Sequence, residues 1–225
     1  MSKRFYAAFV PLLAVAAFAV VPATSQAAEF HWYKCQHEAT ATHNFSDSEC
    51  QKEVAKTGSW EWARLPFTSA KTQVITFGKL TLTASNGIVI TCKKVDAGNI
   101  WNVTEPTAGQ DNVEVFVNYE CKSEQCATVS VTAKNLPWTS ELAAGPVDKI
   151  KGIEVTVNCA GTELTFKGEL SPKVVNSTET EPLFEEFTTA TGELEEPLLK
   201  LKATVVGRDR ALGFEHGEDL RVKAP

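Results

Sequence analysis

Apolar and polar residues alternate with a period of two over much of the chain after residue 72, which is typical of strands that bury one face. In the segment 80–84, Leu80, Leu82 and Ala84 share one face and threonines occupy the other. The turn 85–87 follows and ends in Asn-Gly, a dipeptide favoured in tight β-hairpins. Similar short segments recur to the end of the chain with turn residues between them, and no long helical period interrupts them. The pattern predicts an all-β fold, either an antiparallel β-sandwich or an open barrel.

Two of these segments, 87–92 and 112–121, each carry a cysteine on the predicted apolar face. Strict alternation in the first segment places Ile88, Ile90 and Cys92 together. In the second segment it predicts one buried face, with Phe116 on the opposite side, made of Val113, Val115, Val117, Tyr119 and Cys121. We therefore expect Cys92 and Cys121 to point into the core.

The chain contains six cysteines, and an even number in an exported protein is typical of a disulfide framework. Cys35 and Cys50 are far in sequence from the others, so we expect them to pair with each other. The remaining four allow three connectivities, and spacing alone does not decide among them. The strand parities argue against a Cys121–Cys126 pair, and of the two connectivities that remain we expect Cys92–Cys121 together with Cys126–Cys159. A zinc site is not expected, because the cysteines and histidines of the segment 35–50 lack paired C-x-x-C spacing.

The N-terminal residues predict export. Lys3 and Arg4 precede an apolar run over residues 5–21, and small residues lead to a cleavage site after Ala27. We expect a signal peptide over 1–27, a disulfide-clamped module over 28–70 and a β-rich domain over 71–225. The product would be freely secreted, without membrane attachment after cleavage. The net charge of −6 argues against nucleic acid as a partner.

Tryptophans are the candidate ligand-contact residues. Trp60 and Trp62 share a face if their segment is a strand, and such a pair could stack on sugar rings. The alternative is that they cover the edge of a core, since tryptophan is usually largely buried. Trp138 lies in the segment 135–142, which breaks the strand pattern and is predicted to cross one end of a sheet together with Leu142.

No catalytic motif is present in the sequence: it contains no G-x-S-x-G, no H-E-x-x-H and no phosphate-binding glycine loop. The acidic residues considered for glycoside hydrolysis are Glu185, Glu186, Glu195, Glu196 and Asp209. Adjacent residues of a strand point to opposite faces, so these side chains are predicted to be solvated surface charges. The acidic stretch 214–219, which includes His216, is expected to be an exposed turn. No catalytic residue, cofactor or metal ligand is predicted.

Four short stretches resemble a group of uncharacterised exported proteins of soil actinobacteria, which are β-rich and contain cysteines. The matching stretches are 33–50, 87–100, 136–138 and 170–176. The resemblance implies export. It implies no activity, ligand or site residue, because none is assigned to those proteins.

Together these features predict a secreted, non-enzymatic binding or surface protein whose partner is a glycan or a protein of the extracellular medium. Two alternatives remain open. An extracellular polysaccharide hydrolase would need two carboxylates facing one cleft. A protease inhibitor would need one rigid exposed loop, and the loop from Asn135 to Glu141 is its only candidate.

Overall fold

The computed structural model describes residues 29–67, 70–104, 107–178, 181–214 and 217–224. The predicted signal peptide lies outside these ranges. Within them the chain forms strands, turns and loops but no helix, which confirms the all-β fold class. Accordingly, no described helix is long and apolar enough to cross a membrane.

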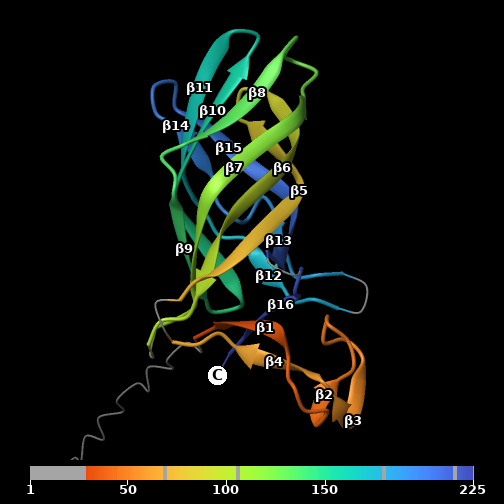
Figure 1. The fold of residues 1–225 in the computed structure, drawn as a ribbon. Helices are drawn as coiled ribbons and strands as arrows, with labels where there is room; N and C mark the ends of the chain where they lie inside the picture. The colour runs from red at the N-terminus through yellow and green to blue at the C-terminus, as the bar shows by residue number, and fades with distance from the viewer. Residues whose placement is uncertain (1–28, 68–69, 105–106, 179–180, 215–216, 225) are drawn as a thin grey trace, which may run out of the picture.

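The strands form two sheets (Figure 1). The small sheet has the order β16–β1–β4–β2–β3, with bounds β1 (His31–His37), β2 (His43–Phe45), β3 (Glu53–Gly58), β4 (Trp60–Arg64) and β16 (Leu220–Lys223). The large sheet contains β5 (Thr72–Ala84), β6 (Val89–Trp101), β7 (Gln110–Lys122), β8 (Val129–Lys134), β9 (Trp138–Ala143), β10 (Val147–Cys159), β11 (Thr162–Leu170), β12 (Lys173–Val175), β13 (Phe184–Phe187), β14 (Leu194–Glu196) and β15 (Leu201–Gly213).

The large sheet closes into an eight-stranded antiparallel barrel, because β15 pairs with β5 along its whole length. Three positions around the barrel are each shared by two shorter strands: β8 with β9, β11 with β12, and β13 with β14. The predicted boundary at residue 70 falls between β4 and β5. The C-terminal strand β16 returns to the small sheet, where it pairs with β1. The range 71–225 therefore contributes to both sheets.

The predicted face parity of β7 is wrong over its middle. Val115 and Val117 are 52% and 51% exposed, and Tyr119 is 42% exposed, whereas Phe116 packs against the core. The pairing with β6 shows the reason, because one extra residue of β7 is inserted between Val113 and Val115, and another between Tyr119 and Lys122. A β-bulge shifts the alternation by one residue. The alternation of inward and outward side chains is therefore inverted between the two bulges and restored at Cys121.

The small sheet covers one end of the barrel. Trp32 of β1 and Leu220 and Val222 of β16 share a hydrophobic cluster with residues of β5, β6, β9 and β12. Asn102, which is fully buried, ties the two parts by hydrogen bonds. It accepts from the Trp32 backbone N–H at 2.9 Å and donates to the carbonyls of Trp32 and Leu65 at 3.0 and 2.9 Å. A second, larger cluster fills the rest of the barrel.

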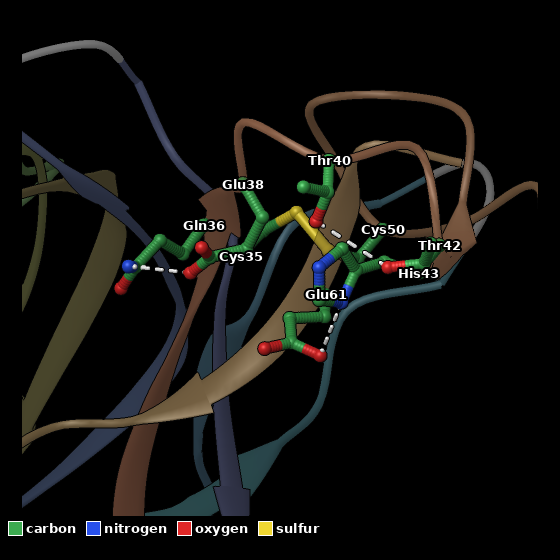
Figure 2. A network of polar contacts seen from close by, with 8 residues as sticks. All are labelled: Cys35, Gln36, Glu38, Thr40, Thr42, His43, Cys50 and Glu61. Atoms are coloured by element: carbon green, nitrogen blue, oxygen red, sulfur yellow. Dashed lines mark hydrogen bonds and ion pairs between the residues drawn. A yellow bond between two sulfur atoms is a disulfide. The ribbon is translucent and has the colours of Figure 1, made fainter. Parts of the chain in front are cut away.

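All three expected disulfides are present: Cys35–Cys50, Cys92–Cys121 and Cys126–Cys159. Figure 2 shows the first, which joins β1 to the turn between β2 and β3. Beside it, His43 Nδ1 lies 2.8 Å from Glu61 Oε2 and links β2 to β4. The outer part of the small sheet buries few aliphatic side chains, so the disulfide is its main constraint.

Replacing Cys35 and Cys50 together with alanine is expected to lower the free energy of unfolding by about 3 kcal/mol. The bridge closes a loop with a sequence separation of 15, and removing it restores the entropy of that loop to the unfolded chain. Urea denaturation measures the loss. Ser48→Ala, an exposed change in the same loop, serves as the control and should have little effect. Equal stability of the double variant and the native protein would show that the bridge is not what orders this module.

Candidate functional site

The barrel encloses a cavity of about 120 Å³ whose wall combines apolar and ionisable side chains. Apolar residues from several strands line one part, among them Ile90, Phe116, Val155, Leu170 and Phe187. The ionisable residues on the wall are Lys94, Asp96, Asp111, Asp148 and Glu185. An eight-stranded barrel is just wide enough either to be filled by side chains or to hold one small ligand.

Lys94 is the centre of the first group of charges. Its ammonium contacts Asp96 Oδ2 and lies 2.5 Å from Asp209 Oδ2, and all three residues are buried. Thr76 donates a hydrogen bond to the other oxygen of Asp96. Burial lowers the pKa of Lys94, but the charges of Asp209 and Asp96 outweigh it and leave the pKa above its ordinary value. The lysine is therefore a permanent cation inside the barrel.

A glycine makes this ion pair possible. Gly78 of β5 lies between Lys94 of β6 and Asp209 of β15 in the registers of both pairs. A Cβ atom at Gly78 would come within 2.2 Å of Asp209 Oδ1 and 2.1 Å of the Arg208 carbonyl oxygen. Because Gly78 has no side chain, Lys94 and Asp209 can reach each other across β5.

The second group consists of three carboxyl groups without a cation. Asp148 of β10 lies within hydrogen-bond reach of both Asp111 of β7 and Glu185 of β13. Ser140 of β9 donates a hydrogen bond to Asp111 Oδ1. Asp148 Oδ1 and Asp111 Oδ2 are buried and have no hydrogen-bond partner among the described residues.

Burial and mutual repulsion make these carboxyl groups weak acids. Burial, opposed in part by the Ser140 hydrogen bond, raises the pKa of Asp111 to about 6. Burial and the charge of Asp111 raise the pKa of Glu185 to about 8 and that of Asp148 well above its ordinary value. The group therefore holds protons near neutral pH, which ordinary carboxylates release.

Two of the acidic residues predicted to be surface charges belong to this interior. Asp209 is 0% exposed, and Glu185 lines the cavity and lies opposite Asp209 in the β13–β15 register. That prediction is wrong for both, and it is also wrong for Glu196, which is 5% exposed. Glu186 does point outward, where Arg208 lies 3.2 Å away. Glu195 is exposed and lies 3.6 Å from Lys200, whereas Glu196 is buried and accepts a hydrogen bond from the Leu199 N–H.

The sequence pattern contained a signal for three of the missed residues. The face shared by Ile88, Ile90 and Cys92 continues, two residues at a time, to Lys94 and Asp96. The same alternation leads from Ala203 and Val205 to Asp209. Ionisable residues on an otherwise apolar face mark a buried polar site. Asp148 and Glu185 have no such signal, because their strands are irregular or short.

The structure separates the three predicted ligand-contact tryptophans. Trp138 is buried inside the barrel, lines the cavity and packs against Phe116 with ring centroids 5.0 Å apart. Trp60 and Trp62 lie on β4, and both are partly exposed. His37 packs edge-on against Trp60, and the Arg221 guanidinium lies 4.4 Å from the Trp62 ring centre. Of these three, only Trp138 lines the barrel cavity, which Trp32 also lines.

Three other candidate sites were considered in the sequence: the protease-inhibitor loop, the acidic stretch 214–219 and a metal site. Trp138 is buried and Leu136 is partly buried against the core, so neither side chain of the protease-inhibitor loop is fully exposed to a protease. His216 lies outside the described residues, and Asp219 accepts a hydrogen bond from Gln51 Nε2 at 3.0 Å. No group of three histidine, cysteine or acidic residues in the described ranges is arranged to hold a metal ion.

Comparison with known protein families, curated proteins and solved structures finds no match for this chain. The resemblance to exported actinobacterial proteins therefore stays a prediction, and the site is interpreted from its own geometry.

Proposed function

We propose that this protein is a secreted, non-enzymatic binding protein that holds a small ligand inside its β-barrel. The observation that carries the proposal is the cavity, whose wall is apolar on one part and carboxyl-rich on another. Ligand sites typically combine an apolar lining with a few converging polar groups that fix the ligand's orientation. Buried ionisable groups with shifted pKa values are likewise concentrated at functional sites.

The surrounding structure supports a rigid container. The barrel is closed, and disulfides join β6 to β7 and the segment before β8 to the end of β10. Three disulfides are consistent with an extracellular protein. A preformed cavity of this kind binds its ligand with little loss of conformational entropy.

The size of the cavity favours binding over polysaccharide hydrolysis. Glu185 and Asp209 do lie opposite each other, as a pair of catalytic carboxylates would. Sites for drug-sized molecules, however, occupy roughly 300–1,000 Å³. A cavity of about 120 Å³ is too small for a segment of a sugar polymer. Asp209 is moreover engaged by Lys94, so it is not free to act as a base or nucleophile.

A thermal-shift screen of small molecules tests the proposal. We expect at least one compound of about six heavy atoms or fewer to raise the melting temperature, since a ligand that binds only the native state stabilises it. Val205→Phe, which fills the cavity, should abolish the shift. Thr204→Phe, on the outward face of the same strand, should preserve it.

Two results would contradict a barrel ligand. One is the absence of any stabilising compound in a library that covers cations, anions and neutral molecules. The other is a hit that survives Val205→Phe but is lost in the double variant Trp60→Ala, Trp62→Ala. That outcome would assign binding to the small sheet instead.

A further inference from the structure

We propose that the ligand of the barrel cavity is a small primary ammonium ion with a short apolar body, bound between Asp111, Asp148 and Glu185. The inference rests on the proposed function and names the chemical class of its ligand. It follows from the charge balance of the barrel interior, from carboxyl oxygens that lack a donor and from the apolar remainder of the wall.

The interior charges do not balance. The ionisable groups facing the cavity region come from five strands: Lys94 and Asp96 from β6, Asp111 from β7, Asp148 from β10, Glu185 from β13 and Asp209 from β15. Lys94 contacts Asp96 and Asp209, and its charge only partly opposes the rise in the pKa of Glu185. In the part of the chain that the structure describes, no cation contacts the other three carboxyl groups.

The unpaired oxygens identify where a cation would bind. Asp148 is only 1% exposed, lines the cavity, and its Oδ1 has no hydrogen-bond partner among the described residues. Asp111 Oδ2 is also buried without a hydrogen-bond partner among the described residues. The neighbours of Asp148 are the other two carboxyl groups, which accept hydrogen bonds but donate none when ionised. These oxygens need a donor from outside the three residues, which bound protons, water or a hydrogen-bond-donating cation can supply, and of these only a cation also offsets the charge.

The barrel already holds one ammonium ion in this way. The Nζ atom of Lys94 contacts two carboxylates and lies 5.1 Å from the centre of the Phe116 ring. A ligand ammonium would have three donors for the three carboxyl groups that lack a cation contact, and charge-assisted bonds of this type are the strong ones. A bare metal ion is less suitable, because the described acidic residues are not arranged as a metal site and much of the wall is apolar.

Cavity volume limits the apolar body. A dry cavity of about 150 Å³ in another protein binds benzene. The space here is about 120 Å³, which corresponds to a ligand of about six heavy atoms or fewer. Unbranched alkylammonium ions from ethyl to pentyl satisfy both the size and the charge requirement.

Binding should be coupled to proton release. Near neutral pH the cluster retains protons, as the raised pKa values of Glu185 and Asp148 indicate. An ammonium ion favours the ionised carboxyl groups and expels a proton. Affinity should therefore increase with pH, by up to tenfold per pH unit for each proton released, and the contribution of Glu185 should level off above its pKa of about 8.

Isothermal titration calorimetry with n-butylammonium and 1-butanol tests the assignment. The two probes have similar size and differ in charge. We expect butylammonium to bind at least tenfold more tightly at pH 7.5, with release of a proton detected as a dependence of the binding enthalpy on the buffer. Glu185→Gln should weaken butylammonium binding at least tenfold. Glu186→Gln, the adjacent outward residue, should leave it unchanged.

The possible outcomes distinguish failure of the ammonium assignment from failure of the proposed barrel-binding function. Equal or tighter binding of 1-butanol would overturn the ammonium assignment and leave the barrel-binding function standing. Butylammonium binding that is independent of pH and insensitive to Glu185→Gln would also overturn it. No binding by any alkylammonium ion from ethyl to pentyl, while a neutral or anionic hit stabilises the protein in the screen, would do the same. The comparison of the two probes on the native chain remains decisive even if the variant folds poorly.

Discussion

Replacing Lys94 with methionine is expected to lower the free energy of unfolding by about 3–5 kcal/mol, because it leaves buried carboxylates without their cation. Asp96 and Asp209 are 4% and 0% exposed, and both contact the lysine. Methionine preserves most of the side-chain volume, so the loss would come mainly from the charge. Urea denaturation at pH 7 measures it.

Lys93 provides the matched control for this substitution. It is the preceding residue, points out of the barrel, and forms an exposed ion pair with Glu120 at 2.6 Å. Exposed ion pairs contribute little to stability. Lys93→Met should therefore leave the unfolding curve nearly unchanged. Similar losses in both variants, or a stable Lys94→Met protein, would show that the interior charges do not depend on this lysine.

The stability of the protein is expected to fall as the pH rises from about 4.5 to about 8. Glu185 has a pKa of about 8 in the folded protein against an ordinary value of 4.5, and Asp111 has a pKa of about 6. Between these limits the folded state binds more protons than the unfolded chain. The stabilisation that these extra protons give is fully present below the pKa that the group has in the unfolded chain. It is lost as the pH rises through the pKa that the group has in the folded protein. The slope is about 1.4 kcal/mol per pH unit for each such proton.

Denaturation midpoints at a series of pH values between 5 and 9 test this dependence. Glu185→Gln removes one titrating group while preserving its size, so the slope between pH 5 and 8 should decrease. Glu186→Gln should preserve it, because that side chain lies outside the barrel beside Arg208. Stability that is constant or increases over this range would contradict protonated carboxyl groups in the folded interior.

Local sequence signals were sufficient for the fold class, and they favoured the correct disulfides without deciding between all the pairings of the last four cysteines. Alternation such as that of Leu80, Leu82 and Ala84 predicts strands, since a half-buried strand must place every second side chain in the core. The pairings Cys92–Cys121 and Cys126–Cys159 also agree with the expectation. The sequence correctly predicted that Cys121 points inward but was wrong for Val115 and Val117. Each bulge of β7 shifts the alternation by one residue, so the two shifts together restore the predicted direction at Cys121.

The sequence could predict only part of the candidate site. The parity that places Cys92 in the core also places Lys94 and Asp96 there, so two of the six ionisable interior residues follow from this alternation alone. Their neutralising contacts do not follow. Asp209 is more than a hundred residues away in sequence and reaches Lys94 only because β15 closes the barrel against β5 over Gly78.

By itself, the sequence determined strands with one apolar face, the turns between them, and cysteines suited to pairing, because these properties depend on residues close together in the chain. The tertiary structure alone decided that the sheet closes into a barrel, that bulges reverse the middle of β7, and that Asp111, Asp148 and Glu185 meet in one cavity. Strand closure and register join residues from distant segments. Whether a carboxyl group such as Glu185 is solvated or buried with its proton depends on those distant neighbours.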